Sequence, residues 1–160
     1  MQETIRLINC GKIVLTDSNG SITLFKNIHV FRVKPKQELL TEIARYCQEH
    51  SITSGVIIGT IGSVEKARLN FLIALPDKYE PVDYPGPLEI VCAQGSIALK
   101  DNNLVIHVYI QLSGQKTCCG GHLAEATIFS TAEVIIGELD YQLRRQIDSH
   151  TGLAELSETR

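Results

Sequence analysis

The chain has 160 residues, of which 44% are hydrophobic and 21% charged, and its formal net charge is −3. This size and composition predict one folded domain with a sizeable core. A pI near 5.9 argues against a broad nucleic-acid-binding surface. No apolar run approaches the roughly 20 residues that span a bilayer, and the N-terminus lacks the apolar core of a signal peptide. Five cysteines without a secretion signal favour free thiols and a cytoplasmic location.

The N-terminal segment contains a strong turn signal between two apolar stretches. Residues 5–15 and 21–25 flank Asp17-Ser18-Asn19-Gly20, and an Asn-Gly pair in such a setting is typical of a tight hairpin turn. We therefore expect residues 1–27 to form a hairpin or an extension packed on the domain, and residues 28–160 to form the domain itself.

A strand, a helix and a buried strand are predicted next. Residues 28–33 alternate between apolar and polar types and end before Pro35. Over residues 36–50, apolar side chains recur at helical spacing (Leu39, Leu40, Ile43, Ala44 and Cys47), which predicts an amphipathic helix that covers a sheet. Residues 55–61 are apolar on both faces, as in a central strand, so the three elements together suggest a crossover connection.

The middle of the chain predicts two further strands on either side of a long loop. Residues 67–75 and 88–99 have strand-like patterns. Pro76–Pro87 holds four of the five prolines, so we expect an irregular loop there. In the polar tail, Leu139, Leu143 and Ile147 fall at helical spacing and suggest a short terminal helix, or a segment that lies over a neighbouring surface.

The most informative stretch is residues 104–136. Its first nine residues alternate cleanly, so that Leu104, Ile106, Val108, Ile110 and Leu112 form one face of a strand. His107, Tyr109 and Gln111 project from the other face, about 7 Å apart. A polar turn and Cys118-Cys119-Gly120-Gly121-His122 follow. A return strand would bring His107 and His122 to the same face, which is the central structural expectation from the sequence.

Several motifs in this order resemble the PPC ("plants and prokaryotes conserved") domain family, also known as a domain of unknown function or as PD1-like DNA-binding protein. The resemblance covers residues 28–156. Its most specific pieces are Gly120-Gly121-His122-Leu123 and Thr131-Ala132-Glu133-Val134, supported by Gly62-Ser63 and Thr151-Gly152-Leu153.

The resemblance implies an α+β fold, a two-layer α/β sandwich with a mostly antiparallel sheet and one main helix, assembled as a homotrimer. In the plant relatives a basic AT-hook segment binds the DNA minor groove, and this sequence contains no such segment. Single-domain prokaryotic members often have His-x-His before the turn and Gly-Gly-His after it, which looks like a divalent-metal site. Here His107 and His122 match the outer positions, and Tyr109 stands where the middle histidine would be.

Three kinds of site are open on these residues. His107 and His122 could hold Zn²⁺ or a similar ion, with a third ligand from Glu125, Tyr109, Cys118 or Cys119. Alternatively, a cleft lined by Tyr109, Gln111, Gly120, Gly121 and Glu125 binds a small molecule. A third, less favoured reading pairs Cys119 with His122 as a nucleophile and base.

The favoured function is therefore a cytoplasmic homotrimer that binds a small ligand or a divalent metal in a histidine-containing cleft. The alternatives are a DNA-associated regulatory protein without an AT-hook, a metal-assisted hydrolase or lyase using the same pocket, and a scaffold that presents a partner-binding surface. The residue types alone name no catalytic residue, and no membrane partner is expected.

Overall fold

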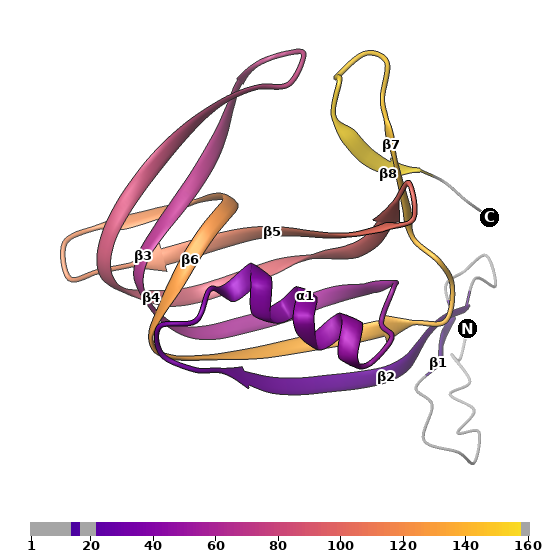
Figure 1. Cartoon of the computed structure of the whole chain (residues 1–160), viewed down its shortest axis with the longest axis horizontal. Helices are drawn as coiled ribbons and strands as arrows, with labels where there is room; N and C mark the ends of the chain where they lie inside the picture. The colour runs from indigo at the N-terminus through magenta and orange to yellow at the C-terminus, as the bar shows by residue number, and fades with distance from the viewer. Residues whose placement is uncertain (1–13, 17–21, 158–160) are drawn as a thin grey trace, which may run out of the picture.

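A computed structural model describes residues 14–16 and 22–157. Strands dominate this part of the chain (Figure 1). In chain order, the elements are β1 (Val14–Thr16), β2 (Ile22–Val33), α1 (Leu39–Glu49), β3 (Gly55–Ala74), β4 (Lys78–Lys100), β5 (Asn103–Ser113), β6 (Cys118–Leu139), β7 (Arg144–Ile147) and β8 (Ala154–Ser157).

The strands form one sheet in the order β1-β2-β6-β3-β4-β7-β8, and β5 pairs with both β4 and β6. The neighbouring strands are antiparallel, except for one parallel bridge between Leu99 of β4 and Arg144 of β7. The prediction of a mostly antiparallel sheet with one helix is confirmed. At 20 to 23 residues, β3, β4 and β6 are much longer than the separate strands expected from the sequence. β3 lies between β4 and β6, whereas β6 pairs with β5 at its beginning and with β2 at its end.

The connection from β2 to β3 is a crossover that carries α1. Both strands pair antiparallel with β6, which lies between them, so they run parallel to one another. Glu38 caps the helix by accepting hydrogen bonds from the backbone N–H groups of Leu40 and Thr41. The same carboxylate also accepts one from the N–H of Ala126 in β6, 3.2 Å away. This shared cap fixes the beginning of the helix on the sheet.

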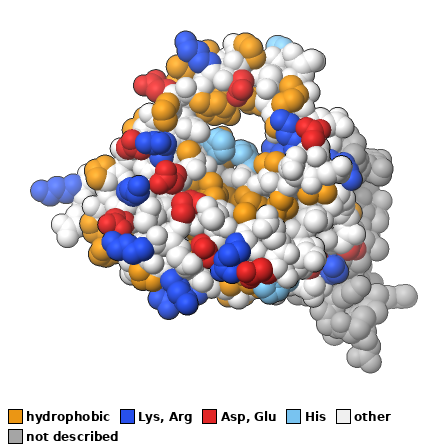
Figure 2. Space-filling model, viewed as in Figure 1, with side chains coloured by type: hydrophobic (Ala, Val, Ile, Leu, Met, Phe, Trp, Pro, Cys, Tyr) orange, Lys and Arg blue, Asp and Glu red, His pale blue; other side chains and the backbone are white. Residues whose placement is uncertain are grey.

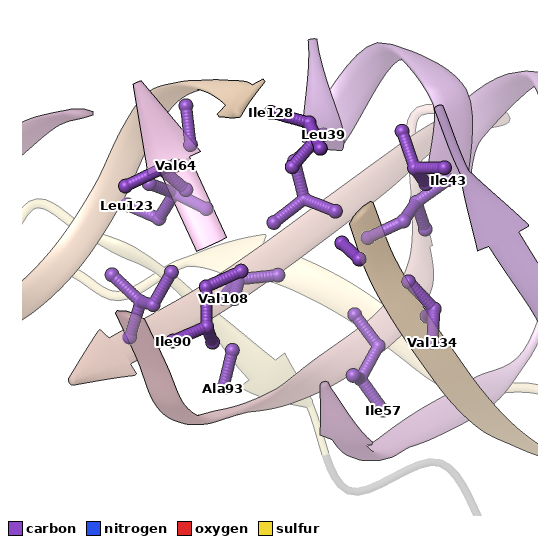
Figure 3. Close-up of a cluster of buried hydrophobic side chains, with 14 of the residues drawn as sticks. Leu39, Ile43, Ile57, Val64, Ile90, Ala93, Val108, Leu123, Ile128 and Val134 are labelled. Atoms are coloured by element: carbon purple, nitrogen blue, oxygen red, sulfur yellow. The ribbon is translucent and has the colours of Figure 1, made fainter. Parts of the chain in front are cut away.

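The core lies between α1 and the sheet. Leu39, Ile43 and Cys47 of the helix are fully buried, at the spacing expected from the sequence, and Figure 3 shows Leu39 and Ile43 near side chains from several strands. Alternate residues of β5 complete this core, including Val108, Ile110 and Leu112. The predicted core face of this strand is confirmed at these three positions.

The expected loop at Pro76–Pro87 is wrong, because β4 begins at Lys78 and its first residues pair with β3. Beyond Asn70 of β3, where pairing with β6 ends, the two strands continue as a two-stranded arm. Pro81 and Pro85 lie opposite Asn70 and Lys66 of β3. In the described residues, pairing of β4 with β5 begins only at Glu89. The proline-rich part is therefore an edge strand, where a missing N–H is tolerated.

The predicted terminal helix is also wrong, since β7 and β8 form an antiparallel hairpin. Its turn contains Gly152, at φ +71°, and a Cβ there would lie 2.8 Å from the Cβ of Pro76 at the tip of the β3–β4 arm. The arm and the hairpin rise on the same side of the sheet (Figure 1), and their tips touch at this point. A glycine is therefore needed both for the backbone conformation and for the close approach.

At the N-terminus, β1 pairs antiparallel with β2, as a hairpin would require, while the predicted turn at residues 17–20 lies outside the described residues. β2 runs without a break across residue 28, where the sequence suggested a domain boundary. The helix in the described part of the chain has 11 residues and is too short to traverse a bilayer.

A histidine-lined hollow between two hairpins

The two histidines singled out by the sequence lie side by side. In the β5–β6 ladder Tyr109 is directly opposite His122, and the ring centroids of His107 and His122 are 4.7 Å apart. The Tyr109 ring stacks on His122 at 5.6 Å. The predicted convergence of the two imidazoles on one face is confirmed, because cross-strand neighbours in a ladder share a face.

The contacts of these rings place them between the β3–β4 arm and the β7–β8 hairpin, and the molecular surface is hollowed there. Figure 2 shows histidine side chains, in pale blue, inside an opening above the sheet. His122 contacts Tyr79 of the β3–β4 arm, with ring centroids 5.8 Å apart, and His107 contacts Arg145 of β7. The arm and the β7–β8 hairpin therefore frame the hollow on two sides, and the contact between Gly152 and Pro76 joins their tips.

Arg145 is the charged residue of this cluster, and it is 8% exposed. Its guanidinium donates hydrogen bonds to the Ala154 carbonyl oxygen at 2.6 Å, to Ser96 Oγ at 2.8 Å and to His107 Nδ1 at 3.2 Å. Because an arginine can only donate, His107 Nδ1 must accept, so the ring proton of neutral His107 is on Nε2. The arginine thus fixes the tautomer of this histidine.

Both imidazoles are held in the neutral form at pH 7. Burial, the positive charge of Arg145 and the neighbouring His122 ring lower the pKa of His107 to about 4. Burial and Arg145 likewise lower the pKa of His122. The Nδ1 atom of His122 is buried and has no hydrogen-bond partner within the described residues. The cluster therefore combines one fixed positive charge with neutral, incompletely hydrogen-bonded rings.

The described residues do not fit a zinc ion at this position. Zinc sites in proteins have three or four protein ligands, and residues 14–16 and 22–157 contain no group of three His, Cys, Asp or Glu side chains that could hold a metal. The guanidinium of Arg145 beside His107 adds a positive charge that would repel a divalent cation. His107 and His122 are thus neighbours without forming a ligand set for an ion.

The other ligand-binding candidates lie further from the two rings. Gln111 lies two pairs along the β5–β6 ladder from Tyr109, opposite Gly120, and its side chain contacts Cys118 Sγ at 3.7 Å and Cys92 Sγ at 4.0 Å. It extends the polar face that carries Tyr109 away from the histidines. Gly120 lies on the same face and is exposed.

Gly121 and Glu125 serve other parts of the fold. A Cβ on Gly121 would lie 3.3 Å from the Phe71 ring, so this glycine allows close packing on the arm. Glu125 forms an ion pair with Lys66 at 3.3 Å and lines a separate cavity of about 320 Å³ at the base of the arm. Neither Gly121 nor Glu125 therefore contributes a side-chain contact to the histidine cluster.

The nucleophile–base reading of Cys119 and His122 is wrong. Cys119 lies opposite Leu112 in the ladder and packs on the hydrophobic core, whereas His122 faces the hollow beside Tyr109. The two side chains project to opposite faces of the sheet. Burial, followed by the neighbouring Cys118, raises the pKa of the Cys119 thiol, which disfavours the reactive thiolate.

Sequence reasoning missed Arg145, Ser96 and Tyr79. Ser96 lies directly opposite His107 in the β4–β5 ladder, so correct pairing of the two predicted strands would have found it. Tyr79 was assigned to a loop and Arg145 to a helix. Their contacts with the histidines depend on the arm and the tail hairpin, which the local pattern did not reveal.

These observations define a bent, mostly antiparallel sheet domain with one helix and a histidine-lined hollow closed over by its own hairpins. The chain belongs to the Plants and Prokaryotes Conserved (PCC) domain family, whose model matches residues 6–140. This is the family, also abbreviated PPC, that the sequence motifs resemble.

Solved structures share the fold. A metal-containing protein from Archaeoglobus fulgidus is 26% identical with a TM-score of 0.78, over 84% of this chain and 95% of that one. A plant- and prokaryote-conserved protein from Pyrococcus horikoshii is 24% identical, also with a TM-score of 0.78, over 96% and 99% of the two chains. A candidate DNA-binding protein from Bacteroides thetaiotaomicron is 19% identical with a TM-score of 0.75, over 91% and 96%.

Among curated proteins, the bifunctional protein GlmU of Synechococcus sp. (strain JA-3-3Ab) is 29% identical over 132 residues. The match covers 81% of this chain but only 20% of that protein. A second Synechococcus GlmU is 28% identical over a similar region. The chain therefore spans about a fifth of the length of the curated relatives it matches.

Proposed function

We propose that this PCC-domain protein binds a small molecule in the hollow between the β3–β4 arm and the β7–β8 hairpin. His107, His122 and Tyr109 would contact the ligand, and Tyr79 would close one side of it. The site combines apolar ring surfaces with a few polar atoms, as small-molecule sites generally do.

One observation supports this proposal most directly: polar groups converge on the hollow, and some of their atoms have no hydrogen-bond partner in the described residues. His122 Nδ1 and Arg145 Nε are buried and lack hydrogen-bond partners in the described residues, whereas buried polar atoms in folded proteins are nearly always paired. In addition, Tyr109 remains 55% exposed although its ring stacks on His122. Unmet hydrogen-bonding capacity of this kind is typical of a site that awaits a ligand or an ordered water.

We further propose that the protein assembles as a homotrimer through the sheet face opposite α1. An apolar stripe crosses four neighbouring strands there. Val30 and Ile135 lie directly opposite one another in the β2–β6 ladder, and the stripe continues through Ile61 of β3 to Val91 of β4. Ile61 is 58% exposed and Val30 67%. Exposed apolar patches of this extent usually mark an interface.

The charges of the described residues do not favour nucleic acid as the partner. Four basic side chains near the arm and the helix are paired with carboxylates: Lys36 with Glu65, Arg45 with Glu42 and Glu49, Lys66 with Glu125, and Arg68 with Asp83. A surface for DNA needs basic groups that are free to replace counterions at the phosphates.

Ligand binding can be tested with the full chain and a panel of small carboxylates, phosphates, amines and neutral nucleosides. A binding compound should shift the ring signals of His107 and His122 in NMR spectra and raise the melting temperature. Tyr109→Phe should weaken the response, whereas the matched control Tyr141→Phe should not, because Tyr141 is 46% exposed but lies away from the cluster. If no compound perturbs the histidine rings of folded protein, the proposal is refuted.

The assembly can be tested by analytical ultracentrifugation. Ile61→Lys places a charge in the apolar stripe and should shift the sedimenting species from trimer to monomer. Ile147→Lys is the matched control, since Ile147 is 57% exposed but lies on β7, outside the stripe. Wild-type protein that sediments as a monomer at micromolar concentration would refute the homotrimer.

A further inference from the structure

The charge of Arg145 is buried without an acidic partner. Its three hydrogen-bond acceptors, the Ala154 carbonyl, Ser96 Oγ and His107 Nδ1, are all neutral. No carboxylate lies within ion-pair distance of it in the described part of the chain, and its Nε is buried and unpartnered. Removing a guanidinium from water without a counter-charge is unfavourable.

Two other arginines, Arg45 and Arg68, show the opposite arrangement. Arg45 and Arg68 have about half of their side-chain surface exposed, and each is paired with at least one carboxylate. Surface ion pairs of this kind contribute little to the stability of the fold, because water already solvates the charge. Arg145, which has the greatest need of a counter-charge, has none in the described residues.

Two neutral side chains beside Arg145 can also donate hydrogen bonds to a ligand. With Nδ1 accepting from Arg145, neutral His107 carries its proton on Nε2, and Tyr109 adds a phenolic hydroxyl on an exposed ring. Charge-assisted hydrogen bonds from arginine to oxyanions are among the strongest that proteins form. The contact of Gly152 with Pro76 closes the frame over the hollow, which favours a small molecule over a nucleic-acid duplex.

We propose that the hollow binds the oxyanion group of a small ligand, a carboxylate or a phosphate, and that Arg145 supplies the compensating charge. This inference rests on the proposed function, that the hollow is the ligand site, and adds the chemical class of the ligand. It also accounts for a sequence in which a histidine pair is combined with a buried arginine instead of a third metal ligand.

The test is a titration of the full chain with sodium phosphate and, separately, with sodium malonate, each against sodium chloride at equal ionic strength. Either oxyanion should shift the His107 and His122 ring signals and the Arg145 Nε–H signal of the wild-type protein. The anion that binds more tightly shows whether the site prefers a phosphate or a carboxylate. Because the Arg145 signal is read in the wild type, the test stands even where a variant fails to fold.

Variants test whether the charge of Arg145 is responsible for the oxyanion binding. Arg145→Gln should weaken oxyanion binding by roughly tenfold or more, and Arg145→Lys should restore part of it. Arg144→Gln is the matched control: it removes the same charge from the neighbouring position, which is exposed. If Arg144→Gln weakens binding as much as Arg145→Gln does, the anion responds only to the overall charge of the protein, and the inference is overturned.

The failure of this inference can be told from failure of the proposed function. Binding of neutral compounds or amines, with no response to phosphate or malonate, would overturn the anion class while the ligand site stands. No response of the histidine rings to any compound would overturn both.

Discussion

The neutral state of His107 has a measurable consequence for stability. The folded protein keeps this imidazole unprotonated down to a pKa of about 4, because burial and the charge of Arg145 oppose protonation, whereas the unfolded chain has the ordinary value of 6.5. Between these two values the unfolded chain binds a proton that the folded protein does not. The free energy of unfolding must therefore fall as the pH falls from 6.5 to 4.

The size of the effect follows from the two pKa values. The difference between 6.5 and about 4 corresponds to about 3 kcal/mol when it is fully expressed. By pH 5, about 2 kcal/mol of this stabilisation should be lost. Since carboxylates and His122 also titrate on acidification, the contribution of His107 is obtained as the difference between the wild type and His107→Gln, which removes the titrating ring.

Urea denaturation at about pH 7.5 and about pH 5, at one protein concentration, measures the free energy of unfolding under each condition. Wild-type protein should lose about 2 kcal/mol more than His107→Gln on going to pH 5. The control His150→Gln removes an exposed imidazole and should lose as much as the wild type. Equal losses in wild type and His107→Gln would refute the assignment of a buried, neutral ring to position 107.

Three further changes test other parts of the structure. Gly152→Ala should destabilise the protein by about 1–2 kcal/mol, through a positive φ and a clash with the arm tip, as measured by thermal melting; Gly59→Ala, with open space at its Cβ, should be nearly neutral. Glu138→Gln should cost on the order of 2 kcal/mol in urea denaturation, because this buried carboxylate accepts three side-chain hydrogen bonds; Asp140→Asn, at an exposed position, should change little. Tyr109→His supplies a third imidazole beside the histidine pair, so it should bind Zn²⁺ by calorimetry while wild type and Tyr109→Phe do not; stoichiometric zinc in the wild type would contradict the structural argument.

The parts of the fold that follow a local pattern could be predicted from the sequence. Strict alternation over residues 104–112 identified the two faces of β5, since side chains on a strand alternate by geometry. The helical spacing of Leu39, Ile43 and Cys47 located α1 within a few residues, and those three side chains are buried. The β5 pattern and the expected return strand together also predicted that His107 and His122 lie close to each other.

The parts that depend on distant partners could not be predicted. Prolines at positions 81 and 85 indicated a loop, because nothing local shows that the strand holding them is an edge strand. The spacing of Leu139, Leu143 and Ile147 suggested a helix, yet pairing with β8 and with β4 determines the structure of that segment. Tertiary contacts overrode a weak local preference in both cases.

The two mispredicted segments are the ones that give the hollow its chemical character. A flat sheet carrying His107 and His122 would leave two exposed imidazoles with ordinary protonation behaviour. The tail hairpin brings Arg145 across 38 and 49 residues of sequence to His107 and Ser96, and the arm brings Tyr79 to His122. These contacts bury the rings, keep them neutral and place a positive charge beside them. The binding preference that we propose for this chain therefore depends on how its arm and tail fold over the sheet, as well as on the histidines themselves.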